Sequence, residues 1–393
     1  LDTTNHISSI VHSTTGGAGI DSYSYQRDFK GNVTQFTSRL GLHSFALDVD
    51  DQLVSATNPS SLLFPEWRDE HYGLDSLGNR LSDSFGANRV DAKGQFLLED
   101  ARYFYFYDPN GNLTAKQAKL STGEGVIRYS YTSENRLSRV QKFSIGIEPY
   151  DPATLWTPSG VPTLSVEYRY DALGRRVVKS AQQAGSVENT NRFYFYDGND
   201  LLFEKNSEGE LLANYTGGGR GPDDLLSVRV TNAGVAAGIA LEAKTYYFLK
   251  DAIGTIQRVV AADGSTVQKY VYSSFGKRLE IRDELDMEIS ASPKMNLALG
   301  FIGREHDAES GLVNLRSRYY DPMAGRLLSR DPVWPEGGLN TYVYSRHNPG
   351  RFVDPMGTDA YVYQTPLAGI SLLGYLGLMH TYIVIGQPGD DFV

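Results

Sequence analysis

A four-residue pattern, Asp-x-x-Gly, recurs along the chain and constrains its fold more than any other feature. Aspartate at the first position of a type I turn accepts hydrogen bonds from the following amides, and glycine at the fourth adopts backbone angles that other residues avoid. Tyr-x-Tyr pairs accompany many of these turns, and a spacing of two places both rings on one face of a strand. Each unit therefore predicts an antiparallel hairpin. The pattern occurs at residues 28–31, 75–78, 83–86, 91–94, 108–111, 171–174, 251–254 and 354–357.

The composition supports short strands joined by tight turns, with 26 tyrosines and 40 glycines in 393 residues. A net charge of −10 argues against a general nucleic-acid-binding surface. The chain has no cysteine, which excludes disulfides and thiolate metal sites. No HExxH, Walker-type or Gly-x-Ser-x-Gly pattern occurs, so zinc-protease, nucleotide-binding and serine-hydrolase functions have no support. We therefore expect neither a cofactor nor a metal.

The chain divides into three predicted segments. Residues 1–285 form a degenerate array of repeats, with an insert near 149–162 whose four prolines cannot lie inside central strands. Residues 286–358 hold a dense series of short motifs, and residues 359–393 are too few for an independent core. The chain begins at Leu1 without a signal-peptide pattern. We interpret it as a fragment of a longer protein whose export signal lies elsewhere.

One apolar stretch in the last segment has about the length of a membrane span. Residues 366–385 carry no formal charge when His380 is neutral. Three glycines and the β-branched residues 383–385 interrupt a uniform helical pattern, which favours a buried helix, turn and strand. We therefore expect no membrane span.

The motifs of residues 301–357 are specific as an ordered set. They are Tyr-Tyr-Asp-Pro at 319–322, Gly-Arg-Leu at 325–327, Ser-Arg-Asp-Pro at 329–332, Gly-Gly at 337–338, Tyr-x-Tyr at 342–344, Asn-Pro at 348–349 and Asp-Pro-x-Gly at 354–357. This set resembles the core domain associated with Rhs/YD-repeat proteins, the bacterial shells that enclose a C-terminal toxin, and with the similar C subunits of Tc toxins. The resemblance implies a mostly β fold, in which a YD-repeat antiparallel strip coils into part of a hollow cocoon and ends in a core domain. The matching structural positions are Tyr320, Asp321, Pro322, Gly325, Arg326, Pro332, Gly338, Asn340, Pro349 and Pro355.

The resemblance also implies that the core domain cuts its own chain, by chemistry similar to that of aspartic proteases. The positions that match the family's catalytic residues are Asp331, Asp354 and Arg318. Peptide hydrolysis needs a base and an acid together, and two carboxylates held close share one proton because like charges cannot both ionise. Arg318 would orient a carboxylate or keep it charged through a bidentate pair. Asp-Pro also starts ordinary turns at three other places in the chain, so the residue pattern alone is more typical of turn caps than of a catalytic pair.

The family cuts just after the Asp-Pro-x-Gly motif, which here is followed by threonine where the family has leucine. We place the scissile bond between Thr358 and Asp359, with the bond between Gly357 and Thr358 as the alternative. The polar, β-branched Thr358 leaves open whether cleavage is retained, slowed, shifted or lost. His306 and His347 are lone histidines in loops, and we interpret them as surface residues.

Two functions are consistent with these features. The first is the C-terminal part of an Rhs-type polymorphic toxin, whose shell encloses an effector that begins in residues 359–393 and frees it by intramolecular cleavage. Its implied partners are its own C-terminal segment, a secretion-system spike or Tc-type B component, and an immunity protein. The second is a non-catalytic YD-repeat protein of the cell surface or wall, similar to teneurins, which binds glycans or other cells. Both place the protein outside the cell or at its surface.

Overall fold

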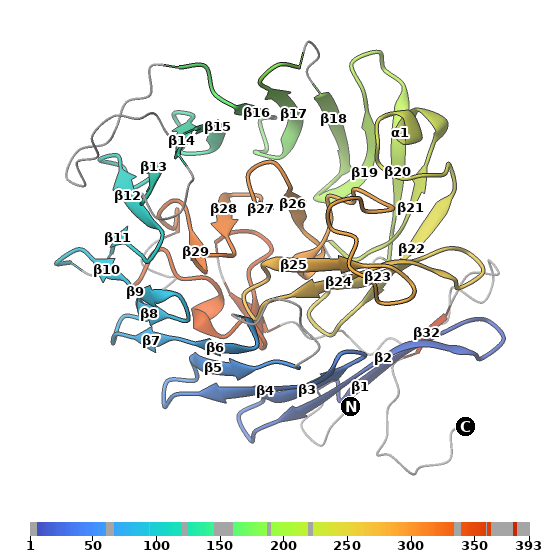
Figure 1. The fold of residues 1–393 in the computed structure, drawn as a ribbon, viewed down its shortest axis with the longest axis horizontal. Helices are drawn as coiled ribbons and strands as arrows, with labels where there is room; N and C mark the ends of the chain where they lie inside the picture. Colours follow the sequence, from blue (N-terminus) through green and yellow to red (C-terminus); the bar gives the residue numbers. More distant parts are fainter. Residues whose placement is uncertain are drawn as a thin grey trace.

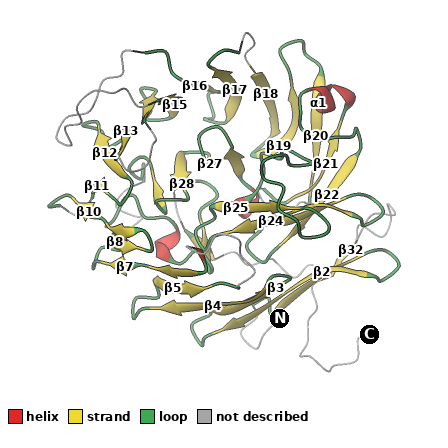
Figure 2. Cartoon of the chain, viewed as in Figure 1, coloured by secondary structure: helices red, strands yellow, loops and turns green. Residues whose placement is uncertain are grey.

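The fold consists almost wholly of antiparallel strands (Figure 1, Figure 2). The computed structural model describes residues 6–59, 67–93, 95–119, 125–144, 160–186, 190–218, 223–333, 339–358, 360–362 and 380–382. Within these ranges, strands that follow each other in the sequence are almost always neighbours in a sheet. This order is what a series of tight turns produces, and it confirms the prediction of a mostly β YD-repeat strip.

The largest sheet contains 16 strands in strict sequence order within the described residues. The turn amides of Gly111 and Gly174 each donate to the carbonyl of the turn's aspartate at 2.9 Å, and both glycines have positive φ. The ladder continues across the predicted insert near 149–162, because the strands on its two sides pair with each other; residues 145–159 lie outside the described residues. The strands are β10 (Arg89–Val90), β11 (Leu97–Glu99), β12 (Tyr103–Tyr107), β13 (Leu113–Ala118), β14 (Val126–Tyr131), β15 (Leu137–Phe143), β16 (Leu164–Tyr170), β17 (Arg176–Gln183), β18 (Thr190–Asp197), β19 (Asp200–Lys205), β20 (Leu211–Gly217), β21 (Leu225–Val230), β22 (Thr245–Lys250), β23 (Ile256–Val260), β24 (Thr266–Tyr272) and β25 (Arg278–Arg282), with helix α1 (Asn232–Ala236) between β21 and β22.

The N-terminal strands form a second sheet, and a small third sheet follows it. The last described strand, β32 (His380–Tyr382), pairs antiparallel with the outer edge of β1, so a segment near the end of the chain lies beside its beginning. The second sheet contains β1 (Ser9–Ser13), β2 (Gly19–Arg27), β3 (Val33–Ser38), β4 (Gly41–Leu47), β5 (Leu53–Thr57) and β6 (Asp69–His71), and the third contains β7 (Gly73–Leu74), β8 (Arg80–Asp83) and β9 (Gly86–Ala87).

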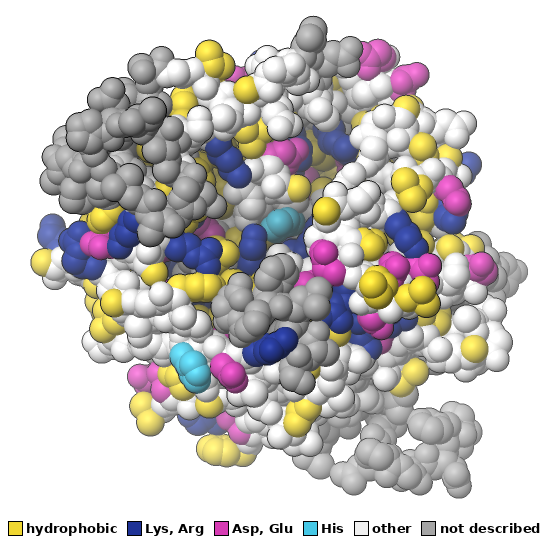
Figure 3. All heavy atoms as spheres, viewed as in Figure 1, with side chains coloured by type: hydrophobic (Ala, Val, Ile, Leu, Met, Phe, Trp, Pro, Cys, Tyr) yellow, Lys and Arg dark blue, Asp and Glu magenta, His cyan; other side chains and the backbone are white. Residues whose placement is uncertain are grey.

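Residues 301–357, here called the core segment, lie inside the curve of the large sheet. In Figure 1, β10–β25 form an arc around β26–β29, and β1–β6 lie across the open side of that arc. A space-filling view of the same face shows a hollow in its upper half, with charged side chains of both signs in it (Figure 3). The strip thus coils into part of a hollow shell, as predicted. The core segment contains β26 (Glu305–Asp307), β27 (Leu312–Leu315), β28 (Arg318–Asp321), β29 (Arg326–Leu327), β30 (Phe352–Val353), which pairs with β31 (Tyr361–Val362), and the 3₁₀ turns η3 (Phe301–Gly303) and η4 (Ser345–His347).

Apolar side chains of the shell and of the core segment share the same hydrophobic clusters. Tyr319 packs with the Tyr-x-Tyr face of the large sheet, and its ring centre lies 5.2 Å from that of Tyr168. Tyr320 and Tyr344 are fully buried in a second cluster that also holds Phe275 from the end of the sheet. The repeated tyrosines therefore face inward, and burying these large rings against the core segment stabilises the wrapped arrangement.

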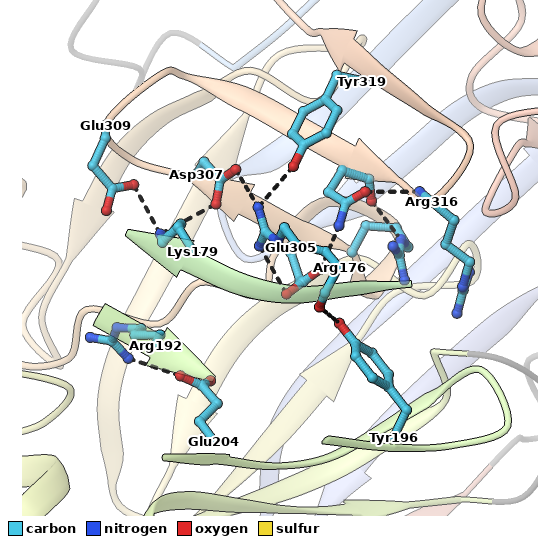
Figure 4. A network of polar contacts seen from close by, with 12 residues as sticks. Arg176, Lys179, Arg192, Tyr196, Glu204, Glu305, Asp307, Glu309, Arg316 and Tyr319 are labelled. Atoms are coloured by element: carbon cyan, nitrogen blue, oxygen red, sulfur yellow. Dashed lines mark hydrogen bonds and ion pairs between the residues drawn. The ribbon is translucent and has the colours of Figure 1, made fainter. Parts of the chain in front are cut away.

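A buried charge network joins the core segment to the shell (Figure 4). Arg176 of β17 donates to Glu305 at 2.9 Å and to Asp307 at 2.6 Å, and Lys179 lies 3.3 Å from Asp307 and 3.0 Å from Glu309. Burial alone would raise the pKa of Asp307, but Arg176 and Lys179 lower it to about 2. Buried charges are tolerated only when they are paired, so this network requires the core segment to sit in one position on β17.

The asparagine that follows a turn provides a further link. Asn79 donates to Asp75 of its own turn at 2.9 Å, and its oxygen accepts from Arg326 at 3.0 Å and from Asn340 at 2.8 Å. Asn32 repeats the arrangement by accepting from two other side chains of the core segment. The core segment is thus held by the turns of the shell as well as by its strands.

Candidate self-cleavage site

The structure brings the three predicted catalytic residues together. One nitrogen of Arg318, Nη2, lies 2.9 Å from Oδ2 of Asp331 and 3.4 Å from Oδ2 of Asp354. All three side chains are at least nine-tenths buried. They come from three separate places in the chain, so only the folded core segment can assemble them.

Each carboxylate is also held by its own backbone. Asp331 follows β29 by four residues; its amide donates to Thr341 at 3.1 Å, and its Oδ1 accepts from the amide of Val333 at 3.0 Å. Asp354 follows β30 and opens the turn of residues 354–357, where its Oδ1 accepts from the amide of Thr358 at 2.9 Å. Both aspartates are therefore turn caps, and in each one the second carboxylate oxygen points to Arg318.

Burial and nearby charges determine which of the two carboxyl groups holds a proton. Burial raises the pKa of Asp354 to about 6, with Asp331 adding to the rise and Arg318 and the amide of Thr358 opposing it. One guanidinium cannot fully neutralise two buried carboxylates, so Asp354 keeps its proton up to about pH 6. The shorter contact with Arg318 belongs to Asp331, which favours Asp331 as the ionised partner and Asp354 as the protonated one.

The end of the Asp-Pro-Met-Gly turn lies directly against Arg318. Arg318 donates through Nε to the carbonyl of Gly357 and through Nη1 to the carbonyl of Thr341 at 3.0 Å. Gly357 has a φ of +69°, and a Cβ there would lie 2.5 Å from the carbonyl oxygen of Leu315. Only glycine fits this close approach, which explains the last position of the motif.

A cleft of about 360 Å³ gives the site access to solvent. Arg318, Asp331, Asp354 and Thr358 line it from the core side. Asp50, Gln52 and residues 76–78, from two turns of the N-terminal strands, line it from the other. The cleft has room for water, which peptide hydrolysis consumes. Two acids, an arginine, a chain segment and water can therefore meet at this place.

The other predicted motif residues hold the structure. Tyr320 donates to the carbonyl of Phe275 at 2.8 Å, and Asp321 forms a buried ion pair with Lys116 at 2.7 Å. Gly325 has positive φ and lies against Arg80. Arg326 and Asn340 bind Asn79, as described above, and Pro349 is buried beside the shell. Pro355 belongs to the turn of residues 354–357, and Pro322 and Pro332 follow their aspartates in other turns. Gly338 and Asp359 lie outside the described residues.

Two histidines of the core segment are not surface residues, and that prediction was wrong. His306 and His347 are both buried, and burial lowers the pKa of His306 to about 3 and that of His347 well below its usual value. His347 ends a run of three consecutive residues with positive φ, of which Arg346 lines the cleft. No local sequence signal marks this backbone, because its shape depends on packing against Tyr72 and Phe275.

Sequence reasoning also missed Arg316, which contacts the Asp-Pro-Met-Gly turn, and its partner Asp223. The available signal was the position of Arg316 two residues before Arg318, at the entrance to the same strand. Among the described residues, no group of three or more His, Cys, Asp or Glu could hold a metal ion. No described helix is long and apolar enough to cross a membrane, and residues 366–379 and 383–385 of the apolar stretch lie outside the description.

The sequence and the fold are similar to those of YD-shell proteins. A family model described as Teneurin YD-shell matches residues 159–352. The double-stranded DNA deaminase toxin A of Burkholderia cenocepacia is 25% identical over 85% of this chain and 22% of its own length. The tRNA3(Ser)-specific nuclease WapA of Bacillus spizizenii is 29% identical over 86% of this chain and 15% of its own, and the probable deoxyribonuclease RhsB of Dickeya dadantii is 30% identical over 73% and 19%.

The fold agrees with a solved toxin shell. The crystal structure of TcdB2-TccC3-Cdc42 matches with a TM-score of 0.50 and 17% identity over 89% of this chain and 19% of that one. The fold and the core segment thus define a YD-repeat β-shell protein. In sequence and in fold the chain is similar to Rhs/YD-repeat proteins. It spans about a fifth of the length of these relatives.

Proposed function

We propose that this chain is the shell and core of an Rhs-type toxin, and that the core cleaves the chain once to free a C-terminal effector. The observation that carries the proposal is the single nitrogen of Arg318 shared by Asp331 and Asp354, beside the end of the Asp-Pro-Met-Gly turn. A shell that only binds other molecules has no need for two buried carboxylates on one guanidinium, which cost stability when they are taken out of water.

The roles follow from the contacts. Asp331, ionised beside Arg318, takes a proton from water as the water oxygen attacks the scissile carbonyl carbon. Asp354 donates its proton to the carbonyl oxygen, which gives a neutral tetrahedral intermediate. When this collapses, the carbonyl oxygen returns its proton to Asp354, Asp331 passes its proton to the leaving nitrogen, and the C–N bond breaks. The fold holds the bond in place, so no binding step is needed.

The scissile bond lies at the end of the turn. We propose the bond between Thr358 and Asp359 as the first choice. The carbonyls of residues 355–357 already accept hydrogen bonds from residues 316–318, whereas Thr358 lines the cleft. The alternative is the bond between Gly357 and Thr358, whose carbonyl is polarised by Arg318. The two products differ by the mass of one threonine.

The remaining parts of the proposal concern the whole protein. Residues 1–285 would form the shell segment, 286–358 the self-cleaving core, and 359–393 the start of the effector. The relatives are named as a DNA deaminase toxin, a tRNA nuclease and a probable deoxyribonuclease, so the enclosed activity differs among proteins with this shell. A shell of this kind requires export, a delivery spike or Tc-type B component, and an immunity protein in the producing cell.

Intact-mass analysis of freshly made protein tests the cleavage. Wild type should yield a fragment ending at Thr358, while Asp331→Asn and Asp354→Asn variants should stay full length. Asp108→Asn is the matched control, because Asp108 opens another Asp-Pro-x-Gly turn and its carboxylate binds Asn112 of its own turn. That variant should be cut like wild type. A full-length wild type would refute self-cleavage and leave a surface-binding role, such as glycan binding, as the better account.

A further inference from the structure

Three consecutive carbonyls of the Asp-Pro-Met-Gly turn accept hydrogen bonds from three consecutive residues. Pro355 accepts from Nη1 of Arg316 at 2.7 Å, Met356 accepts from the amide of Ser317 at 3.2 Å, and Gly357 accepts from Nε of Arg318. We call residues 316–318 the clamp. It holds the carbonyls of residues 355–357, and the carbonyl that follows, that of Thr358, belongs to the bond proposed to be cut.

The first member of the clamp is tied to the shell. Arg316 forms a fork with Asp223, Nη1 to Oδ2 at 2.8 Å and Nη2 to Oδ1 at 2.9 Å, and its Nη2 also donates to the carbonyl of Asn199 at 3.0 Å. Asn199 lies in the turn between β18 and β19, and Asp223 precedes β21. One guanidinium therefore contacts two loops of the shell and the turn that leads to the cut.

The surroundings of Arg316 leave its side chain little freedom. Arg304 also donates to Asp223, at 2.6 Å, so two arginines converge on one carboxylate. The backbone amide of Arg316 donates to Asn314 at 2.9 Å, and Asn314 donates to Glu305, which continues the charge network of Figure 4. Arg316 itself has a φ of +63°, an uncommon conformation for a residue with a side chain. Contacts from several elements are needed to hold such a residue.

We infer that Arg316 is a positioning residue through which docking of the shell controls the cut. Without Asp223 in place, the guanidinium loses its fork and Pro355 loses its donor, so the turn can shift relative to Asp331 and Asp354. Self-cleavage would then occur efficiently only after Asn199 and Asp223 of the shell have docked on Arg316 of the core segment. This rests on the proposed function, and it adds a folding checkpoint: the effector is freed only inside a formed shell.

The test measures both the rate and the position of the cut. Full-length chain is made by cell-free translation, and its cleaved fraction is followed by intact mass for wild type, Arg316→Lys and Asp223→Asn. Lysine keeps the positive charge but cannot reach Asp223 and Pro355 as a fork does. We expect cleavage slower by on the order of a hundredfold in both variants, and products that end at more than one neighbouring bond.

The matched control is Glu204→Gln. Glu204 is buried in the 16-stranded sheet, where it pairs with Arg192 at 3.0 Å and accepts a hydrogen bond from Tyr215. Within the described residues, these contacts involve neither the clamp nor the turn of residues 354–357. Loss of this pair should destabilise the shell without moving the cut. A shifted cut position distinguishes positioning from general stability, because weakened folding lowers the yield of product but leaves its mass unchanged.

Two results would overturn the inference. One is folded Arg316→Lys and Asp223→Asn proteins that cut at the wild-type rate and give the single wild-type mass. The other is loss of folded structure in both variants, seen by near-ultraviolet circular dichroism, which would assign the pair to stability alone. An uncut wild type is a different outcome, since it refutes the proposed cleavage before the variants are compared.

Discussion

Self-cleavage should be about tenfold faster at pH 5 than at pH 7. The proposed acid is Asp354, whose pKa is raised to about 6 by burial. At that pKa the protonated fraction of Asp354 falls from about nine-tenths at pH 5 to about one-tenth at pH 7. Only the protonated form can donate to the carbonyl oxygen, so the rate should follow this fraction and fall as the pH rises through about 6.

The assay begins with wild-type chain that is quenched into urea during cell-free translation, before it folds and cuts, and is then diluted into buffers from about pH 4 to about pH 8. The cleaved fraction is followed by intact mass, and circular dichroism at each pH confirms that the chain has refolded. The Asp108→Asn variant should show the same profile as wild type. A rate that rises steadily from pH 5 to pH 8 would refute the assignment, because Asp354 would then act in its ionised form.

Three further changes follow from the burial of single residues. Asp354→Asn should remove a pH dependence of stability: the pKa of Asp354 is higher in the folded than in the unfolded chain, so the stability that this group contributes is present below about pH 4, and about 2 to 3 kcal/mol of it is lost as pH rises through about 6. Gly357→Ala should cost about 1 to 3 kcal/mol and abolish the cut, because its Cβ meets a backbone oxygen at 2.5 Å. Arg176→Met should cost about 3 to 5 kcal/mol by leaving buried Asp307 with a weaker partner. Urea unfolding measures all three.

The glycine and arginine changes each have a matched control. Gly209 also has positive φ, but a Cβ there would meet nothing within 4 Å, so Gly209→Ala should cost only its backbone strain. Arg139 forms an exposed pair with Glu167, and Arg139→Met should change stability by less than about 1 kcal/mol. Equal losses in Gly357→Ala and Gly209→Ala, or in the two arginine variants, would contradict the reasoning from burial. So would an Asp354→Asn effect that is independent of pH.

Much of the fold was predictable because its turns are local. An aspartate that caps the following amides and a glycine with positive φ act within four residues, so each hairpin can be recognised without knowledge of the rest of the chain. Strand order then follows, because a hairpin makes sequence neighbours into spatial neighbours. Inserts do not disturb this, as the pairing of β15 with β16 shows.

The site was predictable only through its family motif. Asp108 and Asp354 both open an Asp-Pro-x-Gly turn and both cap it with a side-chain oxygen. They differ in where the folded chain places them, since Asp354 is 3% exposed and shares Arg318 with Asp331. No local pattern distinguishes the two turns. Ordered motifs over 57 residues of the core segment singled out the turn at Asp354, which the structure places beside Arg318.

The sequence by itself therefore determined the antiparallel strip, the placement of paired tyrosines on one face of a strand and the candidates Arg318, Asp331 and Asp354. Tertiary structure alone decided the raised pKa of Asp354, the burial of His347, and the contact between Arg316 and Asp223, which are 93 residues apart. The physical reason is the range of the forces involved. Turn hydrogen bonds act between near neighbours in the chain, whereas desolvation and charge pairing depend on every segment that packs around a group.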